Sequence, residues 1–204
     1  MDIQLSVKPG SWALFARRKA DKAFQPFAQR IFERDNYTCQ FCGFQARDYQ
    51  EVVNLDQNYT NNKLPNLATA CCFCAQCFFL ESVGKGGYGG GTLIHLPEIK
   101  QTELNSLCHV LFCAITNDTG YRDVSQTLYR SLRFRSQIVD RQFGEGCSEP
   151  STFCRLLIES NMYNNPEFNA RVMPGLRLLP SRAKFKTQIE HWASTAIQEI
   201  ASEF

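Results

Sequence analysis

The cysteines are the residues of this sequence whose types and spacing most clearly point to chemistry. Cys39 and Cys42 form one Cys-x-x-Cys pair, and Cys71 and Cys74 form a second pair further along the chain. Each pair can place two thiolates on one side of a tight turn, and four thiolates suit a tetrahedral zinc ion. Because four thiolates leave no coordination position for an activated water, we expect one structural zinc ion, held by Cys39, Cys42, Cys71 and Cys74.

The second pair is ambiguous, because the run from Cys71 to Cys77 contains both Cys71-x-x-Cys74 and Cys74-x-x-Cys77. We favour the first of these, since Asn66-Leu67 precedes Cys71 at the spacing expected before a second zinc knuckle. The sequence leaves open whether Cys77 replaces Cys71 as a ligand. Reduced core cysteines and a redox pair are two further interpretations, although paired Cys-x-x-Cys motifs favour metal binding over thiol exchange.

Hydrophobic periodicity predicts the elements that position these cysteines. Residues 2–8 alternate between apolar and polar side chains, which predicts a short strand that Pro9-Gly10 ends. A helix is predicted over residues 24–35, where apolar residues recur on one face, and this helix would hold the first pair in place. A short strand is expected at Val52-Val53, a polar loop at 58–66, and a helix that starts at the second pair.

The remainder of the chain is predicted to be mainly helical. Residues 84–91 form a glycine-rich loop that fits the G-x-G-x-x-G nucleotide fingerprint, but the required preceding strand and following helix are missing. The pattern beyond it predicts helices over 98–115, 122–142, 151–161 and 182–203. The last helix carries a wide apolar face, which either packs on the protein's own core or binds a partner: Phe185, Ile189, Trp192, Ala196 and Ile200.

Length and composition limit the class of protein. With 204 residues, 44% hydrophobic residues and 16 phenylalanines, the chain can bury a real core. A formal net charge of +2 is weak support for a nucleic-acid binder. No apolar run approaches the roughly 20 residues that span a bilayer, and the first residues lack a signal-peptide pattern. Most of the ten cysteines fall in metal-type spacing, so a reducing cytoplasm is expected, with the scattered ones buried: Cys108, Cys113, Cys147 and Cys154.

The residues around the cysteines resemble the zinc-stapled module of HNH endonucleases. The resemblance rests on Arg34-Asp35 before the first pair, Gly43 after it, and Asn66-Leu67 before the second pair. It implies a treble-clef or ββα fold over residues 30–83. In that family an Asp-His pair on the strand, a central Asn and a His after the final Cys activate water and hold a catalytic divalent metal.

This chain departs from the HNH pattern at the catalytic positions. The Asp-His pair falls on Val53-Asn54, the later His falls on Ala75, and Asn66 alone is retained. An amide does not take up a proton at neutral pH, and a methyl group cannot ligate a metal. We therefore expect no catalytic residues, with Asn54 and Asn66 as loop formers. The histidines lie outside the module and are expected at the surface or in packing: His95, His109 and His191.

Three longer runs, 5–12, 34–45 and 66–74, resemble the IcmJ (DotN) family of the Dot/Icm type IVB secretion apparatus. The resemblance implies an HNH-like protein without nuclease activity, located in the cytoplasm and held at the inner membrane through the coupling complex. Its implied partners are the coupling ATPase DotL, together with DotM and the IcmS–IcmW adaptor, which form a platform that recruits effectors for translocation. No nucleic acid is expected as a partner, and no partner-contacting residues can be assigned from the resemblance.

The expected fold class is therefore α+β, with an HNH-like structural zinc module embedded in a largely helical single domain over 1–204. The module covers 30–83, the glycine-rich loop 84–91, and the mainly helical remainder 98–204. An active HNH-type metal-dependent endonuclease, or a nucleic-acid-binding protein, is the alternative. A zinc deaminase is disfavoured, because the His-x-Glu and Pro-Cys-x-x-Cys motifs of such enzymes are absent from the sequence.

Overall fold

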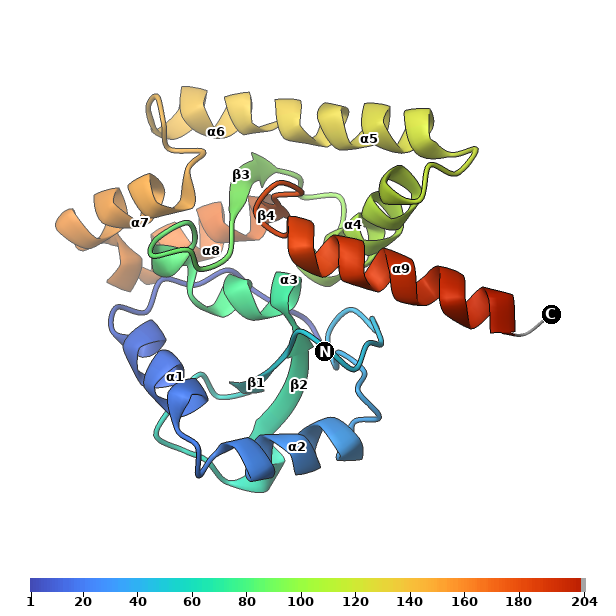
Figure 1. Cartoon of the computed structure of the whole chain (residues 1–204). Helices are drawn as coiled ribbons and strands as arrows, with labels where there is room; N and C mark the ends of the chain where they lie inside the picture. The colour runs from blue at the N-terminus through green and yellow to red at the C-terminus, as the bar shows by residue number, and fades with distance from the viewer. Residues whose placement is uncertain (203–204) are drawn as a thin grey trace.

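The computed structural model describes residues 1–202, with side chains through residue 199, and has the expected α+β character (Figure 1). Within this range, two small antiparallel sheets are formed by β1 with β2 and by β3 with β4. The helices and strands are α1 (Ser11–Ala20), α2 (Gln25–Arg34), β1 (Gln50–Asn54), β2 (Leu67–Cys71), α3 (Cys72–Ala75), β3 (Gly91–His95), α4 (Gln101–Thr116), α5 (Arg122–Phe134), α6 (Ser136–Phe143), α7 (Pro150–Glu159), α8 (Pro166–Val172), β4 (Leu176–Pro180) and α9 (Lys186–Ser202). None of these helices combines the length and apolar character needed to cross a membrane.

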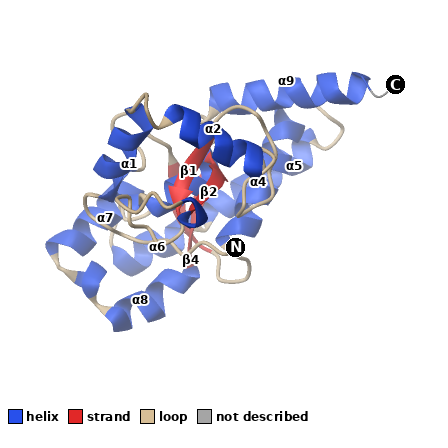
Figure 2. Ribbon diagram, turned by 90° about the horizontal axis from the view of Figure 1, so that it is seen from below, coloured by secondary structure: helices blue, strands red, loops and turns tan. Residues whose placement is uncertain are grey.

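The β1–β2 hairpin and helix α2 form one packed unit, which Figure 2 shows with α2 in front of the two strands. Ile31 of α2 is fully buried against Val52 of β1 and Leu67 of β2. The end of α2 is also bonded to β2. The Arg34 guanidinium donates to the Leu67 carbonyl at 2.7 Å, and the Asp35 carboxylate accepts from the Thr69 amide at 2.9 Å. Arg34-Asp35 therefore fixes the approach of the chain to the first cysteine pair.

Helix α4 is the central support of the C-terminal half and packs against α3, α5, α9 and β4 (Figure 1). Its apolar residues Leu104, Cys108 and Phe112 are fully buried, as the helical spacing predicts. They belong to a core that also contains Phe15 of α1 and Phe73 of α3. The hydrophobic core is thus continuous from the N-terminal half of the chain to the C-terminal half.

The predicted helices are found, although some differ in extent, and the helix expected at the second cysteine pair is only the short α3. The predicted helices at 24–35, 98–115 and 151–161 are α2, α4 and α7, and the long prediction over 122–142 is two helices that meet at Arg135. Helix α9 begins later than predicted, at Lys186, and residue 203 lies outside the described range. Its first turns pack on the core through Ile189 and Trp192, while Ile197 is 51% exposed. The side chain of Ile200 lies outside the described residues.

The predicted strand at residues 2–8 is wrong. Ile3, Leu5 and Val7 are buried in alternation, but the segment joins neither sheet of the described residues. Alternation of apolar and polar residues indicates that one side of an extended segment faces the core. It does not show that the segment pairs with a neighbouring strand. Helix α1, helix α8 and strand β4 were not predicted, since α1 buries only Phe15 and Arg18 and so has a weak pattern.

In the glycine-rich segment 84–91, residues 84–90 lie outside helices and strands, Gly91 begins β3, and the segment is bonded to the core. The buried Gln76 side chain accepts a hydrogen bond from the Gly90 amide at 2.9 Å. At Gly91 a β-carbon would lie 2.6 Å from the Leu179 carbonyl oxygen, so any larger residue would collide with strand β4. Glycine is therefore required at this point by close backbone approach.

Gln101 closes the outer edge of β4 in place of another strand. Its side-chain amide donates to the Leu178 carbonyl and its oxygen accepts from the Leu178 amide, both at 2.8 Å, and it is 1% exposed. We expect Gln101→Leu to destabilise the fold by about 2–4 kcal/mol, because two buried backbone groups lose their partners. Urea unfolding measures this change, and Gln198→Leu on the exposed side of α9 is the control. Equal midpoints for the two variants would contradict the role of Gln101.

Candidate metal centre

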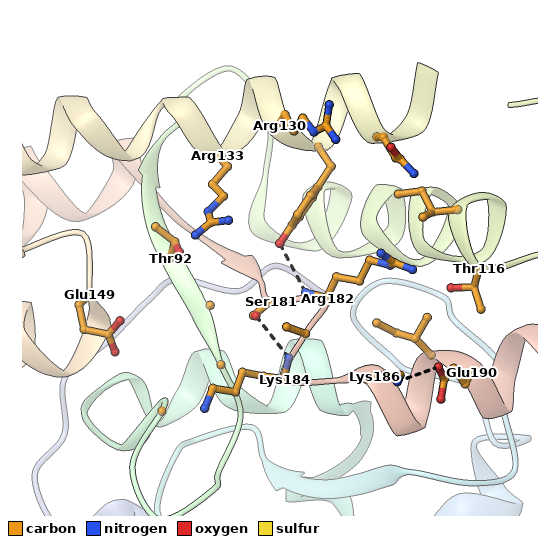
Figure 3. A pocket seen from close by; sticks show the side chains of 18 residues that line it. Thr92, Thr116, Arg130, Arg133, Glu149, Ser181, Arg182, Lys184, Lys186 and Glu190 are labelled. Carbon is orange, nitrogen blue, oxygen red and sulfur yellow. Dashed lines mark hydrogen bonds and ion pairs between the residues drawn. The ribbon is translucent and has the colours of Figure 1, made fainter. Parts of the chain in front are cut away.

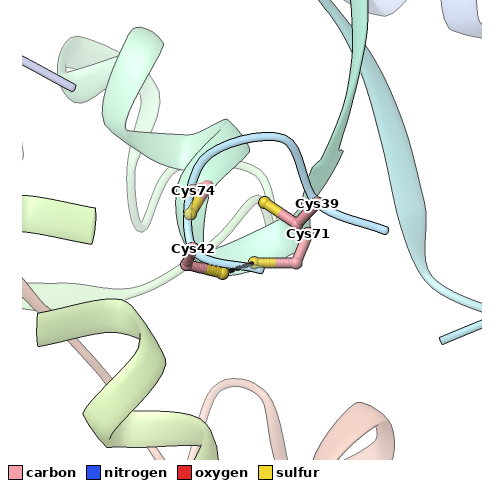
Figure 4. A group of neighbouring side chains, drawn as sticks. All are labelled: Cys39, Cys42, Cys71 and Cys74. Atoms are coloured by element: carbon pink, nitrogen blue, oxygen red, sulfur yellow. Dashed lines mark hydrogen bonds between the residues drawn. The ribbon is translucent and has the colours of Figure 1, made fainter. Parts of the chain in front are cut away.

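Four cysteines from two distant segments meet in one cluster (Figure 4). The sulfur atoms of Cys39, Cys42, Cys71 and Cys74 all lie within 4.8 Å of one another, and the Cys42 and Cys71 sulfurs are 3.6 Å apart. Thiolates bound to zinc at about 2.3 Å in a tetrahedron are separated by about 3.8 Å. The sulfur positions therefore fit a metal ion of this size, and the group could hold one.

The first pair lies on a tight turn that needs a glycine. The Gly43 amide donates to the Cys39 carbonyl at 3.0 Å, and the Cys39 amide donates to the Phe44 carbonyl at 2.8 Å. Gly43 has φ +79°, and a β-carbon there would have open space around it, so the backbone conformation rather than crowding demands glycine. A hydrogen bond of 2.9 Å from the Gln40 amide to the Thr69 carbonyl joins this turn to β2.

The second pair uses a change from strand to helix. Cys71 is the last residue of β2, and Cys74 follows within the short helix α3, so one helical turn brings both sulfurs to the same side. Cys77 lies outside the four-sulfur cluster, and its thiol donates to the Phe73 carbonyl at 3.3 Å. The geometry thus favours Cys71 over Cys77 as a partner of the first pair.

The environment of the sulfurs changes their acidity in opposite directions. Hydrogen bonds from Cys42 and the other neighbouring thiols lower the pKa of Cys39, whereas burial raises the pKa values of Cys71 and Cys74. Buried thiols with raised pKa values are inert as nucleophiles. A metal cation reverses this situation, because it binds thiolates and expels their protons. The raised pKa values of Cys71 and Cys74 therefore disfavour thiol exchange by these two residues, and a metal could still bind all four sulfurs.

Helix α4 contributes two polar groups that face the sulfurs. The Asn105 side-chain amide donates to the Cys74 sulfur at 3.2 Å, and the Nε2 atom of His109 lies 3.3 Å from the Cys71 sulfur. The His109 ring is stacked between Phe44 and Phe73, with ring centroids 3.6 Å and 4.3 Å away. Burial lowers the pKa of His109 to about 3, so its ring is neutral at physiological pH.

The sequence predicts His109 to be a packing residue, and the stacking confirms this, but its contact with the cluster was missed. Nothing in the local spacing around His109 indicates this contact, because it depends on how α4 docks against the second pair. The other two histidines are as expected. His191 is exposed and pairs with Asp48 at 3.0 Å, and His95 is half-buried beside Gly175.

We expect His109→Phe to fold normally and to bind zinc about tenfold more weakly. Phenylalanine retains the stacking with Phe44 and Phe73, but it cannot donate to the Cys71 sulfur, and loss of such a supporting bond typically costs 10–100-fold in metal affinity. Competition with a chromophoric chelator measures the zinc affinity, and thermal unfolding with saturating zinc checks the fold. Unchanged zinc affinity would assign His109 to packing alone.

Asn54, which the resemblance to HNH endonucleases aligns with a histidine, is completely buried. Its amide donates to the carbonyls of Asn58 and Asn61 at 2.9 Å and 2.8 Å. Its side-chain oxygen accepts from the guanidinium of Arg18, which also donates to the Val52 carbonyl at 2.6 Å. Both N–H groups of this amide bond the loop, and its oxygen bonds the buried guanidinium.

Asn66 is likewise a loop former, as predicted. Its amide donates to the Asp56 carboxylate and to the Asn61 carbonyl, both at 2.8 Å, and its oxygen accepts from the Asp56 amide at 3.0 Å. The third position of the HNH pattern, Ala75, is buried at the end of α3 and offers only a methyl group. These three residues support the loop and the core, and none of them presents a group that could activate water.

Comparison with known proteins gives one close relative. Over 200 residues the chain is 63% identical to "Type 4 apparatus protein DotN" of Legionella pneumophila strain Philadelphia 1. The match covers 98% of this chain and 93% of the relative. No family model matches the chain.

Proposed function

Because the chain belongs to the DotN family of type 4 apparatus proteins, we propose that it is a non-catalytic, zinc-stapled component of a type IV secretion apparatus. An identity of 63% that extends over nearly the whole of both chains supports a shared role. The four-cysteine cluster is the single structural observation that carries the proposal, because it is closed, buried and contacted by elements from both halves of the chain. The ion holds the turn that carries Cys39 and Cys42 against the junction of β2 and α3 that carries Cys71 and Cys74.

The proposed ligands are Cys39, Cys42, Cys71 and Cys74, and the proposed metal is a single structural zinc ion. Zinc suits a four-sulfur set at tetrahedral spacing, and it has no redox chemistry of its own. Cys39, Cys71 and Cys74 are buried, so an ion at this place would be shielded from water on most sides. When bound, the ion supplies no open coordination position, and its chemical contribution is to fix the two turns.

We also propose that residues 30–83 form an HNH-like module within a single domain over 1–204. The order of β1, β2 and α3, with the sulfur cluster where β2 passes into α3, supports a ββα arrangement. The continuous core supports one domain, in which the loop over 84–91 and the helical remainder over 98–204 pack directly on the module. Such a module keeps the metal staple of a nuclease while Asn54 and Ala75 stand where catalytic histidines would be needed.

The proposed partners are the coupling ATPase DotL, the subunit DotM and the IcmS–IcmW adaptor, bound on the cytoplasmic side of the inner membrane. The family membership supports this proposal, and membrane association would be through the partners alone. The test is affinity isolation of the tagged protein from its native host, with zinc quantified in the same sample. Recovery of an inner-membrane ATPase together with about one zinc per chain is expected, and nucleic acid as the sole companion would contradict the proposal.

An active nuclease is the competing function. A DNA cleavage assay distinguishes it from the proposed non-catalytic role in a secretion apparatus. With magnesium or manganese present, no nicking of supercoiled or linear DNA is expected, because Asn54, Asn66 and Ala75 offer neither a base nor a set of metal ligands. Metal-dependent nicking that disappears in the Asn66→Ala variant would establish the nuclease instead.

A further inference from the structure

A broad groove lies on the side of the molecule where α5, the β4–α9 connection and the start of α9 converge (Figure 3). Its volume is about 750 Å³. Most of the charged residues on its walls are cations, which we call the basic groove residues: Arg130 and Arg133 of α5, Arg182 and Lys184 of the connection, and Lys186 of α9. None of them touches the cysteine cluster.

The basic groove residues hold more positive charge than the groove neutralises. Lys186 lies 3.7 Å from Glu190 in the next turn of α9. Among the described residues, no carboxylate lies at ion-pair distance from the four others, and their side chains are exposed. Like charges gathered in a concave site focus a positive potential there and repel one another until an anion binds.

The walls of the groove are held in place by hydrogen bonds. The Tyr129 hydroxyl donates to the Pro180 carbonyl at 2.9 Å and accepts from the Arg182 amide at 3.4 Å, which fixes the connection against α5. The Lys184 amide donates to the Ser181 hydroxyl at 3.4 Å, and the Phe185 amide donates to the Ser181 carbonyl at 3.2 Å. The backbone positions of Arg182 and Lys184 are therefore set by the fold.

The groove is also partly apolar and is not uniformly positive. Ile115 of α4 and Ile189 of α9 lie on its lining, and both belong to the buried core. The carboxylates of Glu149 and Glu190 lie on the lining as well. Burial raises the pKa of Glu149, while the charge of Lys184 acts in the opposite direction. A ligand that fits must carry negative charge and must tolerate two carboxylates.

We propose that the basic groove binds an acidic peptide segment of another secretion-apparatus protein. The inference rests on the proposed function, because it names the chemistry of one partner of that assembly. Carboxylates of the segment pair with the arginine forks of α5, a geometry in which two parallel hydrogen bonds form. Glu149 and Glu190 accept from peptide amides, which a peptide offers along its whole length.

A nucleic acid or a membrane surface fits these observations less well. A phosphate backbone carries a negative charge at every step, so some phosphates would lie beside Glu149 and Glu190, whereas the carboxylates of a peptide can be spaced to avoid them. A lipid headgroup layer is flat on this scale, whereas the cations lie on the walls of a concave groove. Both remain as outcomes of the test.

The test uses the whole protein in its native host, isolated through a tag after photocrosslinking from p-benzoylphenylalanine placed at Gln126 on the lining of the groove. The crosslinked peptide is identified by mass spectrometry, and a segment with a clear excess of Asp and Glu is expected. Arg130→Glu combined with Arg133→Glu should lower recovery of that subunit at least about tenfold, since each close charge pair becomes a repulsion. Arg17→Glu combined with Arg30→Glu, which makes the same charge change on α1 and α2, should leave recovery within twofold.

Thermal unfolding and zinc content establish that each variant is folded, and Arg182→Gln with Lys184→Gln replaces the α5 pair if that pair fails to fold. A neutral or basic crosslinked segment, a nucleic acid or a lipid would overturn the proposal. So would unchanged recovery with the folded groove variant. If instead the unmodified protein recovers no apparatus subunit, the proposed function itself fails, and this outcome is visible before any groove variant is compared.

Discussion

Cys39→Ser and Cys71→Ser are each expected to abolish most zinc binding and to unfold the segment around the cysteine cluster. Both residues are buried, and each supplies one of four sulfurs to the cluster. Structural zinc contributes on the order of 10 kcal/mol or more in small metal domains, whereas a whole domain is stable by about 5–15 kcal/mol. Loss of one thiolate therefore removes a contribution comparable to the total stability. Partner binding should disappear with the fold.

Cys147→Ser is the matched control for these variants. Cys147 is also buried, but it lies far from the sulfur cluster along the chain, and its thiol donates to the Phe143 carbonyl at 3.3 Å. A serine hydroxyl can make the same hydrogen bond, so we expect a change in stability of no more than about 1–2 kcal/mol. Metal analysis by mass spectrometry and thermal unfolding with and without a strong chelator provide the measurements. Equal solubility and zinc content in all three variants would contradict a structural role for zinc at the four cysteines.

The cysteine cluster could be predicted from the sequence because its information is local. Each pair lies within a single turn, and the turn chemistry of Gly43 is visible in the sequence itself. The other polar contacts of the sulfurs come from a later part of the chain. Asn105 and His109 lie on α4, which β3 separates in sequence from the second cysteine pair. Their spacing along α4 reflects only its buried face, so no local pattern separates a residue that touches a sulfur from one that only packs.

The same distinction explains the errors in the fold prediction. The alternation of residues 2–8 correctly shows which side chains are buried, but strand pairing requires a neighbour that the sequence of this segment cannot specify. Strand β4 was missed because its sequence, Leu-Arg-Leu-Leu-Pro, does not alternate strictly between apolar and polar residues and follows helical turns directly. Gln101 then takes the place of a further strand at its edge, and a single buried glutamine gives no signal of that role before the structure is seen.

Asn54→Ala is expected to destabilise the protein by about 3–5 kcal/mol, a large part of its total stability. Asn54 is fully buried and accepts a hydrogen bond from Arg18, whose side chain is 8% exposed. Burial lowers the pKa of Arg18, which shows that the charged form is poorly solvated where it lies. Removing one partner of a buried charged group costs several kcal/mol, and the carbonyls of Asn58 and Asn61 lose donors in the same step.

A double-mutant cycle tests whether this cost comes from the charge. In Arg18→Met with Asn54→Ala, the guanidinium and its acceptor are removed together, so the loss should be smaller than the sum of the two single losses by about 1–3 kcal/mol. Asn66→Ala is the control, since its bonds lie at the half-buried edge of the same loop and should contribute only about 1 kcal/mol. Urea unfolding of the zinc-loaded wild type, the three variants of the cycle and the control measures the five free energies. If the two single losses add strictly, Asn54 supports only the loop. If they do not add, the difference is the free energy of interaction between Asn54 and the buried Arg18.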